Sequence, residues 1–405
     1  MERPINYQWL SLLALAGVLS ALYLTSALYP GPINADALRY FSIEQAQSAR
    51  AYSFVPRIIF ITSFIFQVIA LGWLVFSRQG AELAHWLEAR NRGHYWKSIV
   101  SYFLFLWLFL RLLRLPFALY GNYYWQKAWG FSNQSLAAWW LDYSKSAALD
   151  LLLSGLSVLM FFYLLKHWPK LWWVIGATLF AVWLVLQNFL WPVLVSPMFN
   201  HFETVKDPTI INMVQDLADK AGIEVDKVLV MDASKRTTMA NAYFSGLGTT
   251  KQIVIYDNLL KNYPVDDIRA VLAHEMAHWQ KGHITQGLTL GILGSFVIWG
   301  LLALFLRGVV PKSGHYRPKL WASVQLFLLL ILMVTNPLQN YISRGMEKQA
   351  DQVSIELTGD PSAVVRLQIN LATKNLSDVS PPEFIVWFGY THPPVLSRIK
   401  AVLGY

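Results

Sequence analysis

The chain has 405 residues, of which 55% are hydrophobic, 15% aromatic and only 14% charged. An ordinary soluble domain has about 25% charged residues, so this composition excludes a typical soluble enzyme or a disordered chain and indicates a membrane protein. Basic loops beside membrane spans explain the net charge of +9 more simply than nucleic-acid binding. Because the chain has no cysteine, disulfides, thiol nucleophiles and cysteine-ligated metal sites are excluded.

Seven apolar stretches are long enough to cross a bilayer, which takes about 20 residues for each helix. The expected spans are residues 9–28, 58–76, 99–119, 149–165, 171–195, 284–306 and 320–339. The first span lacks a convincing small-residue cleavage site and six spans follow it, so we expect a retained membrane helix. The third span carries Arg111 and Arg114, and the fifth carries Gln187 and Asn188. Such polar groups usually face a bundle interior or water, which favours a polar space between the helices.

Two stretches, 196–283 and 344–405, have the mixed polar and apolar composition of a soluble unit. Within the first, the pattern predicts an amphipathic helix over 209–220 that ends at Gly222, strands over 227–231 and 252–256, and a helix over 266–283. The last two spans separate the two stretches in the sequence. We therefore expect a mainly α membrane protein of about seven transmembrane helices, with a small α+β unit split by the sixth and seventh spans.

The central motif is His274-Glu275-Met276-Ala277-His278. Residues four apart lie on one face of a helix, so both imidazoles can reach one metal ion. Glu275 lies on the adjoining face, where it can take a proton from a metal-bound water. His283 follows His278 by five residues, and the spacing favours an interface histidine over a group that supports the metal site.

A catalytic zinc needs a third protein ligand and one open coordination position. Glu347 is the best candidate, because Asp351 follows it by one helical turn and can accept the second N–H of a ligating histidine. Glu356 competes for the same role. The spacing alone does not decide between the two glutamates.

The segment Val-Leu-Ala-His-Glu-Met-Ala-His-Trp-Gln-Lys-Gly-His, residues 271–283, resembles the zinc helix of the type I CAAX prenyl endopeptidases. These are multi-spanning zinc metalloproteases, and their bacterial relatives include heat-shock membrane proteases. Ser234-Lys235-Arg236 and the stretch 241–246 are similar to the segment before that helix. Glu347 and Asp351 match the family's Glu-x-x-x-Asp motif, and the stretch 391–394 with Arg398 matches its C-terminal His-Pro element. The resemblance covers most of the chain.

The resemblance implies a role for each matching residue. The zinc ligands, for one Zn²⁺ per chain, would be His274, His278 and Glu347. Glu275 would be the general base and later the proton donor, and Asp351 would orient a ligand. An edge strand for pairing with the substrate backbone would contain Asn241, Ala242 and Tyr243. His392 and Arg398 would line the site, His392 helping to stabilise the oxyanion.

These expectations define an integral membrane zinc endopeptidase that hydrolyses peptide bonds by glutamate-assisted attack of zinc-bound water. Residues 1–196 would form an N-terminal region of five spans, and residues 197–405 a metallopeptidase domain that includes the last two spans. The resemblance also implies that the seven helices enclose a water-filled chamber. The substrates would be C-terminal CAAX-type polypeptides, prenylated or not, or membrane-associated polypeptides. The alternatives are a broad quality-control protease without a lipid requirement and a non-catalytic scaffold.

The sequence does not decide in which membrane the protein lies, or to which side of that membrane the zinc site opens. The protein is expected in the inner membrane of a bacterium or the endoplasmic reticulum of a eukaryote, among membrane lipids and in an unspecified oligomeric state. Basic residues are more frequent on the side of the membrane that holds the N-terminus, for example Arg78, Arg90, Arg92 and Lys97 after the second span. Because basic loops usually lie in the cytoplasm, this bias places the N-terminus in the cytoplasm and the zinc site outside it. The resemblance implies the opposite arrangement, with a site that opens to the cytosol.

Overall fold

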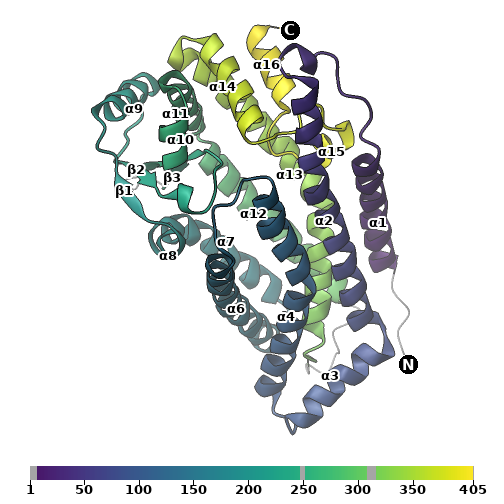
Figure 1. Ribbon diagram of the computed structural model, residues 1–405. Coiled ribbons are helices and arrows are strands. Elements are labelled where there is room, and N and C mark those ends of the chain that lie inside the picture. Colours follow the sequence, from purple (N-terminus) through teal and green to yellow (C-terminus); the bar gives the residue numbers. More distant parts are fainter. Residues whose placement is uncertain (1–6, 247–250, 308–315, 405) are drawn as a thin grey trace.

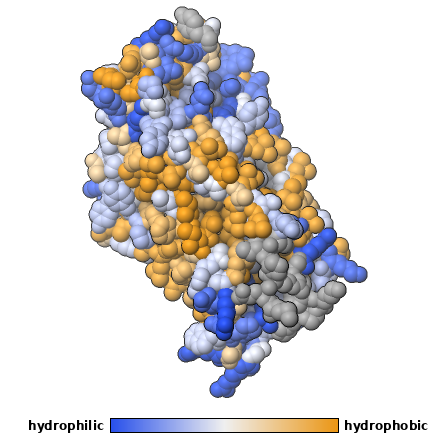
Figure 2. All heavy atoms as spheres, turned by 90° about the vertical axis from the view of Figure 1, so that its right-hand side faces the viewer, coloured by the Kyte–Doolittle hydropathy of each residue, from blue (hydrophilic) through white to orange (hydrophobic). Residues whose placement is uncertain are grey.

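Long helices dominate the computed structural model, which describes residues 7–246, 251–307 and 316–404 (Figure 1). Within these residues, seven helical segments are long and apolar enough to cross a membrane, as the sequence predicts. They contain α1 (Tyr7–Leu28), α2 (Ile43–Phe76), α4 (Tyr95–Leu119), α6 (Leu136–His167), α7 (Trp172–Leu190), α12 (His283–Leu306) and α13 (Leu320–Thr358). Figure 2 shows a broad apolar band across one face, with hydrophilic side chains gathered at the two ends.

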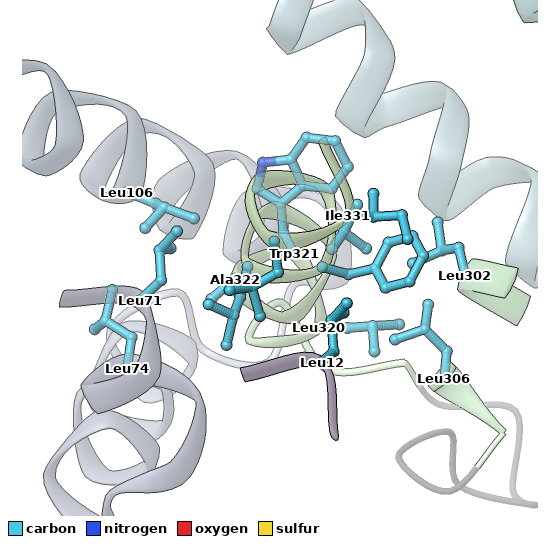
Figure 3. Close-up of a cluster of buried hydrophobic side chains, with 14 of the residues drawn as sticks. Leu12, Leu71, Leu74, Leu106, Leu302, Leu306, Leu320, Trp321, Ala322 and Ile331 are labelled. Carbon is cyan, nitrogen blue, oxygen red and sulfur yellow. The ribbon is translucent and has the colours of Figure 1, made fainter. Parts of the chain in front are cut away.

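The helix α13 forms the centre of the bundle. In its most apolar window, 61% of the residues are buried, against none in the most apolar window of the segment Trp172–Phe199, which includes α7. Figure 3 shows leucines of α1, α2, α4 and α12 around its first turns, among them Leu12, Leu74, Leu106 and Leu306. This packing fixes the axis of α13, and with it the direction in which the helix leaves the bundle.

Two expectations about helix limits are wrong. We expected the seventh span to end at residue 339 and a separate soluble stretch to begin at 344, but α13 continues without interruption to Thr358, where Gly359 ends it in a left-handed conformation. Pro337 lies inside this helix. The basic segment after the second span, treated as a loop, contains the amphipathic helix α3 (Arg78–Arg90). Hydropathy marks where a helix is apolar, and it does not mark where an amphipathic continuation stops.

A four-stranded sheet lies beside one end of the bundle, with strand order β1, β2, β4, β3 (Figure 1). The strands are β1 (Phe202–Thr204), β2 (Lys227–Met231), β3 (Ala242–Ser245) and β4 (Gln252–Tyr256). The strands β2 and β4 are parallel, and the outer two pair antiparallel with their neighbours. The expected strands 227–231 and 252–256 are confirmed, and β3 forms one edge of the sheet.

Helices cover this sheet and share a core with it. The helix α9 (Pro208–Ala221) starts at the Asp207 cap and ends at left-handed Gly222, as expected. With α11 (Val265–Gln280) it buries a cluster that includes Leu217, Ile253, Leu272 and Met276. The remaining short helices are α5 (Trp125–Ala128), α8 (Ser196–Phe199), α10 (Asp257–Asn262), α14 (Pro361–Lys374), α15 (Glu383–Gly389) and α16 (Val395–Leu403).

The helix expected over 266–283 is interrupted near its end. The helix α11 stops at Gln280, Gly282 adopts a φ of 66°, and α12 begins at His283. A positive φ at this position favours glycine, because a side chain would be strained there. The turn redirects the chain from α11 into a membrane helix, and it places His283 beside the last turn of α11.

The close approach of Gly176 in α7 to Trp299 in α12 allows the packing of these two spans to be tested. A methyl group at Gly176 in α7 would overlap the ring of Trp299 in α12, whereas one at Gly72 in α2 meets no atom within 4 Å. We expect Gly176→Ala to lower the thermal unfolding midpoint in detergent, at a cost of about 1–3 kcal/mol. Gly72→Ala is the matched control and should leave the midpoint unchanged or raise it. Equal midpoints for both variants would contradict this packing.

Candidate active site

Two helices bring three potential metal ligands together. His274 and His278 lie on one face of α11, and Glu347 faces them from α13. His274 Nε2 lies 3.1 Å from Glu347 Oε2 and 3.3 Å from His278 Nε2, and His278 Nε2 lies 3.5 Å from Glu347 Oε1. Ligand atoms of all three residues lie within 4.8 Å of one another. Two imidazole nitrogens and a carboxylate that converge in this way fit the ligand set of a catalytic metal ion.

The competing glutamate lies elsewhere. Glu356 is an exposed residue two and a half turns further along α13, whereas Glu347 is 6% exposed. Glu356 is not part of the ligand cluster found among the described residues. The preferred candidate, Glu347, therefore lies with the two histidines on the face of α13 that packs on α11, and Glu356 does not.

A carboxylate lies behind the first histidine. His274 Nδ1 lies 3.1 Å from Asp351 Oδ1, and Arg398 Nε donates to Asp351 Oδ2 at 2.8 Å. Asp351 is 8% exposed, so its charge depends on these partners. Arg398, on α16, therefore contacts the carboxylate that lies next to His274.

A second histidine lies behind His278. His283 Nδ1 is 2.9 Å from His278 Nδ1, and His283 Nε2 is 3.2 Å from Gln349 Oε1. His283 is only 5% exposed. The interpretation of His283 as an interface residue is therefore wrong, because the turn at Gly282 brings its ring back against α11. The preceding Gly282 was the signal in the sequence that could have revealed this.

Glu275 lies in a half-buried position beside the cluster. Burial raises the pKa of Glu275 to about 7, while the nearby His274 and the backbone N–H of Phe244 lower it. A cation held by the neighbouring residues would favour the carboxylate further. A carboxylate with a pKa near neutrality can both accept a proton and return it, which is what general acid–base catalysis requires.

The edge strand β3 passes next to Glu275. The Tyr256 N–H donates to the Asn241 carbonyl oxygen. Because hydrogen-bonded positions alternate along an antiparallel pair, the backbone groups of Tyr243 also point toward β4. Those of Ala242 and Phe244 point away from β4, toward the open edge of the sheet. The outward-pointing N–H of Phe244 interacts with the carboxyl group of Glu275. A pocket of about 480 Å³ lies beside the strand, lined by Gln187, Asn188, Trp191, Pro192, Phe244, Ser245, Gly246 and Ile284.

The C-terminal His-Pro element closes another side of the cluster. His392 Nε2 lies 3.3 Å from Glu347 Oε2, and the side chain is 56% exposed. Its Nδ1 is 2.8 Å from Thr391 Oγ1. The stretch Ser234-Lys235-Arg236 lies outside the cluster, where Arg236 Nε donates to Asp142 of α6 at 3.0 Å. This ion pair attaches the sheet region to the membrane bundle.

Comparisons with known proteins follow the same division of the chain. The model of peptidase family M48 matches residues 204–405, and the model of the CAAX prenyl protease N-terminal region, with five membrane helices, matches residues 32–201. CAAX prenyl protease 1 of Saccharomyces cerevisiae is 31% identical over 313 residues, which cover 72% of this chain and 69% of that protein. The chain belongs to the CAAX prenyl protease family.

Other members of this family extend the comparison over nearly the whole length. YhfN of Bacillus subtilis, described as an uncharacterized metalloprotease, is 29% identical over 382 residues, which cover 91% of this chain and 87% of that protein. The crystal structure of Ste24p from S. mikatae matches with a TM-score of 0.82 at 26% identity, covering 99% of this chain and all of that one. The resemblance, the mainly helical fold with a small sheet and the integral multi-pass membrane location are confirmed.

Membership in this family makes the protein a metalloendopeptidase that acts on peptide substrates. A metallopeptidase implies a metal ion, and the cluster of His274, His278 and Glu347 fits one. No other residues among those described gather three such ligand atoms so closely.

The choice between the two glutamates of α13 can be measured directly. We expect Glu347→Gln to abolish stoichiometric metal binding, because a neutral amide replaces the carboxylate between the two imidazoles. Glu356→Gln is the matched control on the same helix and should retain the metal content of the unmodified protein. Metal content of the purified proteins, by inductively coupled plasma mass spectrometry, gives the answer. Loss of metal in Glu356→Gln alone would refute the assignment.

Proposed function

We propose that the chain is a zinc-dependent endopeptidase of membrane-associated polypeptides, with one Zn²⁺ held by His274, His278 and Glu347. The observation that carries this proposal is the convergence of these ligand atoms beside the carboxyl group of the half-buried Glu275. When bound, zinc lowers the pKa of a water molecule and polarises the scissile carbonyl group. The residues of the chain supply the proton transfers and the alignment.

Glu275 is the proposed general base. It accepts the proton of the attacking water and then passes it to the leaving amine, so no covalent intermediate is required. Its burial and the hydrogen bond from Phe244 hold the carboxylate at a fixed position next to the ligands. The reaction therefore needs no nucleophilic side chain, in agreement with the absence of cysteine.

Three residues around the cluster complete the proposed site. His392, exposed and next to Glu347, is placed to donate a hydrogen bond to the developing negative charge on the carbonyl oxygen. Asp351 orients His274, and Arg398 holds Asp351 in place. Arg398 is thus assigned a positioning role, since its contact is with Asp351 and not with the reacting atoms.

The substrate backbone is proposed to add to the edge of the sheet at β3. Asn241 and Tyr243 pair with β4, and the Ala242 N–H donates to Asn241 Oδ1 at 2.9 Å, which leaves the outward carbonyl oxygen of Ala242 to pair with an incoming strand. An extended peptide along this edge would run past Glu275, because Phe244 of the same strand contacts it. Pairing through the backbone favours segments without stable structure, such as chain ends.

We further propose that residues 1–196 and 197–405 form the two domains and that the seven helices enclose a polar chamber. Charged groups inside the spans support the chamber, because Arg111 of α4 lies 3.8 Å from Asp150 of α6, and Trp107 Nε1 also donates to Asp150. Intramembrane charges of this kind usually face water or a bundle interior.

The catalytic assignment is tested by Glu275→Gln. We expect the rate of peptide cleavage to fall by about 100- to 10,000-fold, because the amide cannot accept the proton of the attacking water. The same variant should keep its zinc content and its unfolding midpoint, since the metal ligands are unchanged. Cleavage in detergent is measured with a quenched fluorescent peptide, and Glu356→Gln is the matched control. Cleavage at the unmodified rate would show that another residue is the base.

The substrate class is tested with two matched peptides that end in a CAAX sequence, one farnesylated at its cysteine and one unmodified. The CAAX prenyl protease name of the yeast relative supports a preference for the lipidated peptide. A buried chain contributes about 0.8 kcal/mol per CH₂ group, so we expect a preference of roughly tenfold or more in kcat/KM. Equal rates would favour the alternative, a quality-control protease without a lipid requirement. No cleavage above the Glu275→Gln blank would favour a non-catalytic scaffold.

A further inference from the structure

The metal ligand His278 is supported by a chain of two hydrogen bonds that ends on a membrane helix. His278 Nδ1 lies 2.9 Å from His283 Nδ1, and His283 Nε2 lies 3.2 Å from Gln349 Oε1. His283 is the first residue of α12, and Gln349 lies on α13 between Glu347 and Asp351. The three side chains therefore join α11, α12 and α13.

The directions of the hydrogen bonds follow from the chemistry at both ends. His278 Nε2 is the atom that faces the other two ligands, so when it binds a cation the proton of a neutral ring is on Nδ1. His283 Nδ1 must then accept that proton, which places the proton of His283 on Nε2. A proton on Nε2 requires an acceptor, and the carbonyl oxygen of Gln349 is an acceptor. With the Gln349 amide oriented as in the structure, this end is compatible with the tautomers that the His278 end requires.

We propose that His283, itself oriented by Gln349, is a positioning residue that holds His278 in the tautomer and ring orientation needed for metal binding. This inference rests on the proposed zinc site. The ring of His283 is buried and enclosed, so its orientation relative to His278 is fixed by packing as well as by the hydrogen bonds. Mutation of a residue that hydrogen-bonds a metal-ligating histidine typically lowers the metal affinity by about 10- to 100-fold.

The two histidine ligands are supported by different chemistry. His274 faces the carboxylate of Asp351, which Arg398 holds. His278 faces a neutral imidazole, which a neutral amide holds. A second carboxylate behind His278 would add negative charge to a cluster that already contains Glu347 and Asp351. The neutral chain orients the ring without that charge.

The test compares variants that separate hydrogen bonding from packing. His283→Phe keeps a ring of similar size and removes the acceptor, so we expect the affinity for Zn²⁺ to fall by about 10- to 100-fold. His283→Asn should recover most of the loss, because the side-chain oxygen of asparagine lies as many bonds from the backbone as Nδ1 of histidine. Affinity is measured by chelator competition on the full-length protein in detergent. His201→Phe, at an exposed histidine outside the cluster, is the control and should bind Zn²⁺ like the unmodified protein.

Gln349 provides an independent variant that leaves the packing intact, because it is an exposed residue. Gln349→Leu should weaken Zn²⁺ binding by about fivefold, the value of one hydrogen bond, and Gln349→Glu should bind more tightly than Gln349→Leu because it keeps an acceptor. Since Gln349 acts through His283, the double variant His283→Phe/Gln349→Leu should be no weaker than His283→Phe alone. A purely structural role would instead make the two losses additive.

The outcomes distinguish this inference from the proposed function. If His283→Phe binds Zn²⁺ as tightly as the unmodified protein, or if His283→Asn is as weak as His283→Phe, the positioning role is refuted while the zinc site stands. If the unmodified protein binds no Zn²⁺, or if His278→Ala binds it equally well, the zinc site itself is wrong and the inference falls with it. A loss of Zn²⁺ affinity in His283→Phe that His283→Asn largely recovers would support both the zinc site and the positioning role of His283.

Discussion

The packing of α11 against α13 is the contact on which the rest of the site depends. The helix α13 is one continuous helix, buried in the bundle over its first half and carrying Glu347 and Asp351 on its second half. The helix α11 supplies both histidines of the cluster and the half-buried Glu275. Because neither helix alone offers three ligands, the metal site exists only when the membrane bundle and the sheet region are assembled together. Stability of the bundle and metal binding are therefore linked.

The site also concentrates buried carboxyl groups, which sets a strict electrostatic requirement. Glu347 and Asp351 are 6% and 8% exposed, and the half-buried Glu275 lies close enough to Glu347 for their charges to interact. Unpartnered charges at such depth are strongly destabilising. Arg398 compensates Asp351, and the two imidazoles face Glu347. A divalent cation at the convergence point would supply further positive charge beside these carboxylates.

The sequence predicted what is local and left undecided what depends on packing. The membrane spans, the two central strands and the paired histidines follow from periodicity over short windows, and the structure contains them where they were expected. Glu347 was the preferred third ligand because Asp351 follows it by one turn, but the spacing alone did not exclude Glu356, which lies on another face of α13. His283 was misinterpreted because a continuous helix was expected, whereas Gly282 turns the chain. The continuation of α13 to Thr358 was missed because its second half is amphipathic.

In the proposed mechanism, the edge strand β3 contacts both the substrate backbone and the proposed base. In β3, the residues that point away from β4 are Ala242 and Phe244, and the N–H of Phe244 is used by Glu275. A peptide added along this edge would order Ala242 and, through the stiffness of an extended strand, Phe244 and Glu275 as well. A structured substrate cannot present an unpaired extended segment to this edge. Selection for chain ends and unfolded segments then needs no dedicated recognition pocket, since the same backbone that admits the peptide aligns the proposed base.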